Sequence, residues 1–249
     1  MDRSGDDQAA AGPEPLIGEV LRAYRAGCFP MADGRDAASR GGRLGWYRPE
    51  TRAVLPLAPG AIGLSQPARV PRRLAAKIRQ APFRITTDAA FEAVVAECAA
   101  PRRETESMTA ETWIDERIEA LFAMLHRAGL AHSVEAWLEK PGGELVLVGG
   151  VYGLAVGRVF CAESMFARPE QGGTDASKVA LVHLMRHCAR QGFTLVDTQF
   201  VNPHLEQFGV VEIPGAAYQA LLDLVGEDDA DWLPFEPDVD AASDSIASR

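Results

Sequence analysis

Hydrophobic residues recur at helical spacing in six stretches of the chain. In the first, residues 16–26, the apolar side chains fall on one face of a helix. Gly27 follows directly and is placed to end that helix, because glycine adopts the left-handed conformation of a helix terminus at little cost. The same spacing predicts the other helices at residues 72–80, 90–98, within 112–128, at 178–190 and at 215–225.

Shorter apolar runs bounded by turn residues predict the strands. Residues 131–139 and 144–166 predict three antiparallel strands joined by turns, and residues 83–88 and 193–200 predict one strand each. Residues 46–57 predict a short strand pair around a Pro-containing turn. Three strands, a helix and a further strand, after a helical start, predict an α+β fold with a mostly antiparallel sheet.

Polar stretches and stretches rich in Gly or Pro indicate how the chain is divided. Residues 33–45 predict an exposed loop, and the Pro-, Gly- and Ala-rich residues 58–68 suggest a boundary. The composition predicts a disordered lead at 1–14, a small N-terminal domain at 15–66, a larger domain at 67–226 and an acidic mobile tail at 227–249.

The composition is that of a globular protein, with 47% hydrophobic and 24% charged residues. No apolar run approaches the roughly 20 residues that span a bilayer, and the polar, acidic N-terminus does not resemble a secretory signal. The four cysteines are far apart, which argues against a disulfide framework and a structural zinc site. A reducing cytoplasm is therefore the expected compartment.

One stretch is strongly basic although the formal net charge is −10. Eleven carboxylates lie in the two terminal segments, so the remaining chain is close to neutral. No acid lies between residues 69 and 84, whose cations either form a solvated surface or bind the phosphates of a nucleic acid. The candidate residues are Arg72, Arg73, Lys77, Arg79 and Arg84.

Asp197, Gln199 and Glu163 are the candidate catalytic residues. Asp197 and Gln199 are two positions apart in an otherwise apolar strand, so their side chains are expected on one face. A carboxylate beside an amide can orient and polarise an attacking amine, whereas the structural alternative is a satisfied polar pair at a strand end. Glu163 follows an apolar run, and its structural alternative is a solvated carboxylate on an edge strand.

Other polar residues predict neither a metal nor a cofactor. Asp175 or Ser177 can cap the helix that contains Lys178, and the start of that helix favours an anion such as a terminal phosphate. No second ligand has metal spacing with His132 or His204, so no metal site is expected. The sequence has neither of the glycine motifs that bind nucleotide phosphates, GxGxxG and GxxxxGK[ST].

Four segments, in order, resemble segments of the leucyl/phenylalanyl-tRNA–protein transferase family. They are GCFPMAD with WYRPETRAVLPL, TWI with LHRAGLAHSVEAW, VGGVYGLAVGRVFCAESMF with DASKVAL, and LVDTQFVNPHLEQFGVVEIP. The resemblance covers roughly residues 17 to 222. The resemblance implies a small N-terminal domain on a larger acetyltransferase-like (GNAT) domain. It also implies transfer of Leu, Phe or Met from charged tRNA to proteins that begin with Arg or Lys, which marks them for degradation.

The resemblance also implies roles for single residues. Asp197 and Gln199 match the family's catalytic pair, Glu163 lies beside the aminoacyl-adenosine end, and the basic helix binds the tRNA acceptor stem. Val151 stands where some relatives have Met and Phe122 where some have Tyr, which could shift the preference among donor amino acids. The residues that match the hydrophobic substrate pocket are Trp113, Phe122, Val151, Phe160 and Val196.

Two other functions compete with this interpretation. A GNAT-type transferase using acyl-CoA would normally have a Gly-rich pyrophosphate loop before a helix, but GGVYGLAVG lies between predicted strands. A non-catalytic module that binds tRNA or protein would keep the basic stretch and tolerate replacement of Asp197. No cofactor is expected, because an aminoacyl ester is already activated and forms an amide without ATP or metal.

Overall fold

The computed structural model of the chain describes residues 14–32, 44–58, 60, 63, 67–100, 112–226, 232, 233, 235 and 246. The lead predicted before residue 14, most of the loop predicted at 33–45 and most of the tail predicted after residue 226 lie outside these residues.

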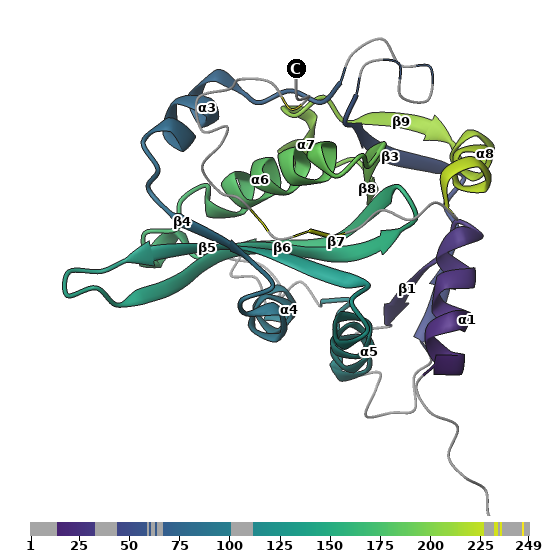
Figure 1. Cartoon of the computed structure of the whole chain (residues 1–249), viewed down its shortest axis with the longest axis horizontal. Coiled ribbons are helices and arrows are strands. Elements are labelled where there is room, and N and C mark those ends of the chain that lie inside the picture. Colours follow the sequence, from purple (N-terminus) through teal and green to yellow (C-terminus); the bar gives the residue numbers. More distant parts are fainter. Residues whose placement is uncertain are drawn as a thin grey trace, which may run out of the picture.

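A seven-stranded sheet forms the centre of the molecule, and a two-stranded sheet lies beside it (Figure 1). The strand order is β4-β5-β6-β7-β8-β3-β9, and every neighbouring pair is antiparallel except β7 and β8, which are parallel. The small sheet pairs β1 with β2. The strands are β1 (Phe29–Ala32), β2 (Leu44–Tyr47), β3 (Thr51–Pro56), β4 (Arg84–Thr87), β5 (Ala131–Glu139), β6 (Leu145–Val156), β7 (Val159–Ala167), β8 (Leu195–Gln199) and β9 (Val211–Pro214).

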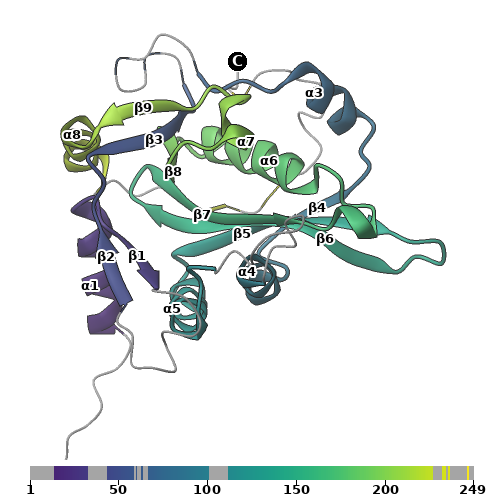
Figure 2. The ribbon, with the colours of Figure 1, turned by 180° about the vertical axis from the view of Figure 1, so that it is seen from behind.

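Helices cover both faces of the large sheet, as the two opposite views show (Figures 1 and 2). α4 and α5 pack on one face in a hydrophobic cluster that also includes residues of α1 and α8, and α3 and α6 pack on the other. The helices are α1 (Glu14–Arg25), α3 (Arg72–Arg79), α4 (Phe91–Ala99), α5 (Glu116–Arg127), α6 (Ala176–Arg190), α7 (Pro203–Glu206) and α8 (Gly215–Val225), with a short 3-10 helix at Pro169–Gln171. None of the helices in the described part of the chain is long and apolar enough to span a membrane.

The predicted α+β class and mostly antiparallel sheet are confirmed, and so is the order of β5, β6, β7, α6 and β8. The predicted end of the first helix is confirmed as well. Gly27 has a φ of 76°, and the amide of Cys28 donates to the carbonyl of Ala23 at 2.9 Å. These contacts form the hydrogen-bonded cap that a left-handed residue allows.

The predicted strand pair at residues 46–57 is wrong in its pairing. Both strands exist, but β2 pairs with β1, whereas β3 lies between β8 and β9 in the large sheet. All five residues of β3 after Thr51 are buried, which is typical of a central strand. The apolar run predicts a strand but does not identify its partners, β8 and β9, which follow about 140 and about 160 residues later. The division of the chain near residue 66 remains a prediction.

Four residues of the predicted tail are described, and three of them pack on the body. Trp232 stacks on His132 with ring centroids 4.3 Å apart and also lies against Phe160. Phe235 lies against His187, and Ile246 is buried in the cluster under α6. These contacts attach the end of the chain to the face of the sheet that carries α6.

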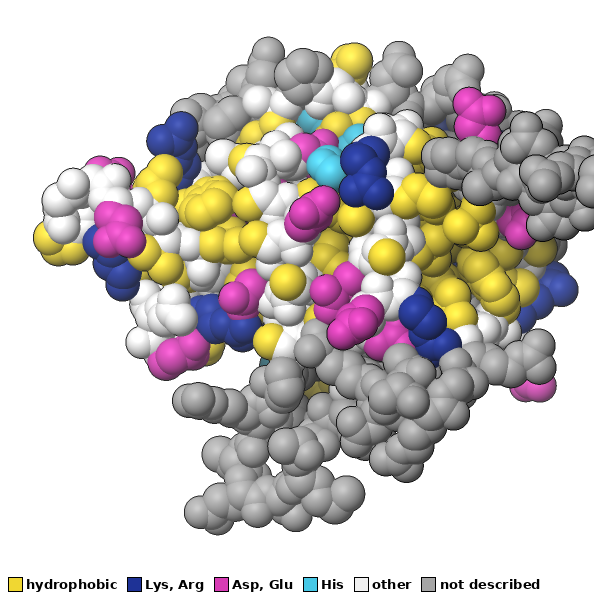
Figure 3. All heavy atoms as spheres, turned by 90° about the horizontal axis from the view of Figure 1, so that it is seen from below, with side chains coloured by type: hydrophobic (Ala, Val, Ile, Leu, Met, Phe, Trp, Pro, Cys, Tyr) yellow, Lys and Arg dark blue, Asp and Glu magenta, His cyan; other side chains and the backbone are white. Residues whose placement is uncertain are grey.

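The opposite face, which carries α4 and α5, presents charges of both signs (Figure 3). Glu92 of α4 and Arg127 of α5 form an exposed ion pair at 3.7 Å. Among the coloured side chains in this view, acidic and basic groups alternate with hydrophobic ones, and no continuous basic area is visible.

Candidate active site

A cavity of about 600 Å³ opens where the parallel strands β7 and β8 separate. The two strands pair only between Val159–Cys161 and Leu195–Asp197, after which each continues alone. The crossover helix α6 begins at the same end of the strands. In open sheets, ligand sites lie beyond the carboxyl ends of parallel strands, and the cavity occupies that position. Its lining includes Glu163, Ser164, Met165, Thr198, Gln199 and Phe200 from the two strands and their ends.

Asp197 is completely buried and does not line this cavity. One of its oxygens accepts a hydrogen bond from the Nη2 of Arg52 at 2.7 Å and another from the hydroxyl of Tyr218 at 2.8 Å. The other oxygen accepts from the Nε of Arg52 and from the backbone amide of Gln199, both at 2.9 Å. The carboxylate is thus fully engaged by the protein.

Arg52 is the counter-ion of Asp197 and is only 1% exposed. It also donates to the carbonyl of Gly27 at 3.1 Å, and its guanidinium lies 4.9 Å and 4.6 Å from the ring centres of Phe29 and Tyr218. Burial lowers the pKa of Arg52, but the charge of Asp197, the neighbouring Tyr218 and the hydrogen bonds to Asp197 together raise it by more, so the guanidinium remains charged. Burial and then the charge of Asp197 raise the pKa of Tyr218, which therefore stays a hydrogen-bond donor.

Gln199 reaches the cavity because the strand ends in a left-handed residue. Its φ is 56°, a conformation that is uncommon for residues other than glycine. The bond from its amide to Asp197 holds this turn. The side chain lines the cavity, is 6% exposed, and its Nε2 has no hydrogen-bond partner among the described residues. Asp197 and Gln199 are therefore joined through the main chain, and only Gln199 lines the cavity.

Glu163 of β7 lines the cavity and is 8% exposed. It lies on an interior strand, so the alternative of a solvated carboxylate on an edge strand is wrong. The hydroxyl of Tyr24 in α1 donates to its Oε1 at 2.8 Å. Burial raises the pKa of Glu163 to about 8; the Tyr24 hydrogen bond lowers it and the charge of Asp197 raises it further. At neutral pH this carboxyl is therefore mostly protonated.

The structure divides the five residues predicted for the substrate pocket. Trp113 and Val151 line the cavity. Phe122 lies in the core under α5, with its ring 5.1 Å from that of Tyr152. Phe160 and Val196 lie in the cluster on the α6 side of the sheet. An apolar residue at strand or helix spacing has the same signature in a core and in a pocket, so the sequence did not separate them.

Several cavity residues were not singled out from the sequence. Phe200 is 54% exposed at the end of β8 and lies 5.8 Å from the ring of Phe29. Its exposure follows from the left-handed turn at the preceding residue, for which the sequence gives no signal. The other large apolar side chains that line the cavity and were not predicted are Phe29, Met31, Met165, Phe166, Leu181 and Leu205.

The start of α6 lines the cavity from another side. Asp175 occupies the N-cap position, as predicted for one of two residues, but its side chain makes no capping hydrogen bond. It faces two lysines instead, with its oxygens 2.9 Å from the Nζ of Lys178 and 3.3 Å from the Nζ of Lys77. These hydrogen bonds lower the pKa of Asp175. Ser177 also lines the cavity.

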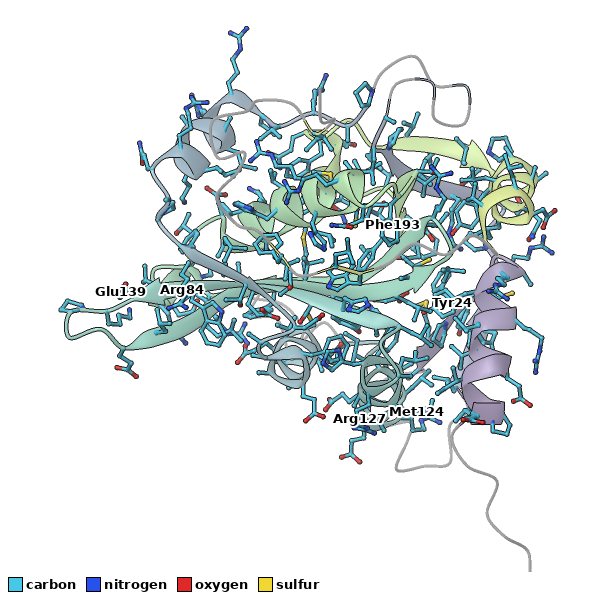
Figure 4. All side chains as sticks on the ribbon, viewed as in Figure 1. Tyr24, Arg84, Met124, Arg127, Glu139 and Phe193 are labelled. Atoms are coloured by element: carbon cyan, nitrogen blue, oxygen red, sulfur yellow. The ribbon has the colours of Figure 1, made fainter. Side chains whose placement is uncertain are left out.

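The predicted basic residues do not form one cluster in the structure. Arg72, Arg73 and Arg79 are exposed on α3, whereas Lys77 is half-buried against the start of α6. Arg84 is exposed on the edge strand β4, at the opposite end of the sheet from Tyr24 (Figure 4). The cations on α3 are therefore linked to the cavity through Lys77, while Arg84 is remote from it.

One group of the described residues could hold a metal ion, namely Asp88, His126 and His132. The Nδ1 of His132 lies 2.8 Å from Asp88, and its Nε2 lies 3.1 Å from the carbonyl of Gly129. The Nδ1 of His126 lies 2.8 Å from the carbonyl of Ala131. Each of these nitrogens already contacts an oxygen, which accounts for the group without an ion. Sequence spacing did not reveal the cluster, and the absence of a metal remains a prediction.

Comparisons with known proteins agree along nearly the whole chain. A family model described as leucyl/phenylalanyl-tRNA protein transferase matches residues 64–223, and one described as the N-terminal domain of that transferase matches residues 16–50. A leucyl/phenylalanyl-tRNA–protein transferase of Nitrobacter winogradskyi is 43% identical over 92% of this chain and 93% of its own length. One from Paramagnetospirillum magneticum is 48% identical over 82% of this chain and 87% of its own, and one from Rhodopseudomonas palustris is 42% identical over 94% and 92%.

These matches extend through the strands that carry Glu163, Asp197 and Gln199 and through the N-terminal helix that carries Tyr24. Similarity of this degree over this share of the chain confirms the resemblance drawn from the four sequence segments. The chain belongs to the leucyl/phenylalanyl-tRNA protein transferase family.

Proposed function

We propose that this chain transfers leucine or phenylalanine, and also methionine, from charged tRNA to the N-terminal Arg or Lys of acceptor proteins. The product is a new peptide bond that marks the acceptor for degradation, and the reaction takes place in the cytoplasm without a cofactor or a metal. The observation that carries this proposal is the juxtaposition of Glu163 and Gln199 in one cavity of about 600 Å³. That volume is in the usual range for small-molecule sites.

The reaction requires an amine to attack an ester. The nitrogen of the acceptor's N-terminus attacks the carbonyl carbon of the aminoacyl ester, a C–N bond forms, and the C–O bond to the ribose breaks. The amine attacks in its neutral form, and the ionised form of Glu163 takes the proton that the nitrogen loses and passes it to the ribose oxygen as that oxygen leaves. Because the pKa of this carboxyl, about 8, is close to that of an α-amino group, about 7.7–8.0, a fraction of each group is unprotonated near neutral pH.

Gln199 is proposed to orient the reacting groups. Its unpartnered Nε2 can donate to the carbonyl oxygen of the ester, where negative charge develops during attack. Asp197 acts through Gln199, because its oxygens are occupied by Arg52, Tyr218 and the Gln199 amide. Asp197 is therefore a positioning residue, and the groups that touch the substrate are Glu163 and Gln199.

Substrate binding uses the remaining walls of the cavity and the basic helix. We assign the donor side chain to the apolar lining, to which Trp113 and Val151 contribute. No direct contact with the donor is proposed for Phe122, Phe160 and Val196, because these side chains lie in the hydrophobic clusters that pack on the two faces of the sheet. The tRNA acceptor stem is assigned to Arg72, Arg73 and Arg79 on α3 with Lys77, and Arg84, exposed on the edge strand β4, is a separate candidate contact.

We propose further that the larger part of the chain has a GNAT-like fold. The support is one parallel strand pair, β7 and β8, joined by the crossover helix α6 within an otherwise antiparallel sheet, with a cavity where the pair separates. The small N-terminal domain is then represented by α1 and the sheet of β1 and β2. The boundary near residue 66 stays a prediction, and β3 is the strand of the predicted N-terminal domain that pairs within the large sheet.

Transfer of labelled leucine tests the proposed function. Leu-tRNA carrying radioactive leucine is incubated with the protein and a model acceptor that begins with Arg, with a second acceptor that begins with Gly as control. Label is expected in the Arg acceptor alone, and without ATP. Acylation from acetyl-CoA without transfer from Leu-tRNA would mean that acyl-CoA, and not charged tRNA, is the donor. Binding of Leu-tRNA without transfer would favour a non-catalytic module.

A further inference from the structure

The first turn of α6 lines the same cavity as Glu163 and Gln199, and the proposed function leaves it without a role. α6 has 15 residues, so its N-terminus carries the partial positive charge of aligned peptide dipoles. The amides of a first turn have no partners within their own helix. The side chain of Asp175, which holds the N-cap position, makes no hydrogen bond to them. The amide of Ala176 donates to the carbonyl of Gly173 at 2.9 Å, so the amides that the turn can offer to this end of the cavity are those of Ser177 and Lys178.

The charged side chains around this turn sum to one positive charge. Asp175 lies within 3.3 Å of both Lys77 and Lys178, so one carboxylate faces two ammonium groups. The other charged pair on the cavity wall, Arg168 with Glu97, is balanced. A helix N-terminus with a net positive charge attracts an anion.

Gln199 indicates independently that the cavity receives a polar ligand. Its side chain is 6% exposed and lines the cavity, and its Nε2 meets no acceptor among the described residues. A buried donor left without an acceptor is costly, so such groups are normally satisfied by a partner. The ligand is thus expected to present an acceptor atom at the Gln199 end and an anionic group at the α6 end.

We propose that the N-terminus of α6, with Ser177 and Lys178, binds the phosphodiester immediately before the terminal aminoacyl-adenosine of the charged tRNA. The phosphate then fixes one end of the nucleoside, and the ester at its other end lies beside Glu163 and Gln199. This inference rests on the proposed function and specifies which part of the donor the site reads. Coenzyme A also carries nucleotide phosphates, so the test includes it as the alternative source of the anion.

Two small donors isolate the phosphate from the rest of the tRNA. One is adenosine with leucine esterified at its 3′ oxygen, and the other is the same molecule with a 5′-phosphate. We expect kcat/KM to be about tenfold or more higher for the phosphorylated donor, since a charge-assisted hydrogen bond is among the stronger polar contacts. Lys178→Gln should remove most of that preference. Arg127→Gln removes a positive charge from α5 and should keep it.

The preference is a ratio of two kcat/KM values measured on one protein, so a partial folding defect in a variant lowers both values equally and leaves the ratio unchanged. An equal ratio in the wild type and in Lys178→Gln overturns the proposal, and so does a wild type that ignores the phosphate. Inhibition by coenzyme A that Lys178→Gln abolishes, without any preference between the leucyl donors, would assign the anion to coenzyme A and overturn the tRNA assignment. A wild type that uses neither the small donors nor Leu-tRNA would instead contradict the proposed function.

Discussion

The Asp197 carboxylate lies outside the cavity, so in the proposed mechanism its effect on the reaction passes through the backbone of Gln199. The amide of Gln199 is held in a left-handed turn by the carboxylate, and that turn directs the side chain. A small displacement of a group that orients reactants can reduce a rate by about two orders of magnitude. The role of Asp197 is thus defined by geometry and can be measured separately from substrate affinity.

Asp197→Asn should lower kcat by about 100-fold while changing the KM for charged tRNA little, because it disturbs the reacting groups more than the binding surface. Tyr218→Phe removes one hydrogen bond from the same carboxylate and should have a smaller effect. Steady-state kinetics with Leu-tRNA would measure both. An unchanged kcat in Asp197→Asn would remove this residue from the mechanism.

Glu163 makes the stability of the fold depend on pH. Its folded-state pKa of about 8 lies above the unfolded value of about 4.3, so the folded chain binds more protons between these values. The contribution to stability is fully present below the unfolded pKa and is lost as the pH rises through about 8. Between pH 5 and pH 8 the free energy of unfolding, measured with urea, should therefore fall by a few kcal/mol less in Glu163→Gln than in the wild type.

Glu92→Gln serves as the control for that measurement, since Glu92 is 74% exposed and should leave the pH profile unchanged. Tyr24→Phe gives a second check with the opposite sign. It removes the hydrogen bond that lowers the pKa of Glu163, so the loss of stability should shift to higher pH. A profile that is the same in all three variants would mean that Glu163 does not carry a raised pKa.

At the scale of single elements, α3 presents three exposed arginines, Arg72, Arg73 and Arg79. Arg72→Ala combined with Arg73→Ala should weaken binding of charged tRNA. It should also reduce the slope of log K against log salt by about two, roughly one per lost phosphate contact. Binding titrations between low and moderate salt would show it. The paired replacement Arg22→Ala and Arg127→Ala removes the same charge from α1 and α5, and an equal effect there would exclude α3 as the specific contact.

The elements were predictable wherever their signal is local. The ranges expected for β5 and for α8 coincide with Ala131–Glu139 and Gly215–Val225. The partners of β3 were not predictable, because a buried apolar run is compatible with any neighbouring strand. The same limit applies to the site. Asp197 and Glu163 were recognisable as carboxylates in apolar strands. The pairing of Asp197 with Arg52 was not predictable, because the two residues are 145 positions apart and neither has a local sequence signal for it.

At the scale of the whole molecule, the end of the chain contributes to stability. Trp232 is half-buried and stacks on His132 while its ring lies 4.5 Å from that of His187. Trp232→Ala should lower the free energy of unfolding by about 2 kcal/mol, less than for a fully buried Trp. Leu233→Ala, at a side chain that is 51% exposed, should stay within about 0.5 kcal/mol. Equal stability in both variants would mean that the tail does not pack in solution.

The position of β3 between β8 and β9 has a consequence for the order in which the chain folds. During synthesis β3 leaves the ribosome early, whereas the strands on both sides of it, Leu195–Gln199 and Val211–Pro214, are made near the end. Closing so long a loop is entropically costly and slow. Until then Arg52 lacks its partner Asp197, and the apolar strand β3 lacks both of its neighbouring strands. The nascent chain therefore carries an unpaired apolar strand until nearly all of it is made, and the completion of the large sheet and of the Arg52–Asp197 ion pair is one event.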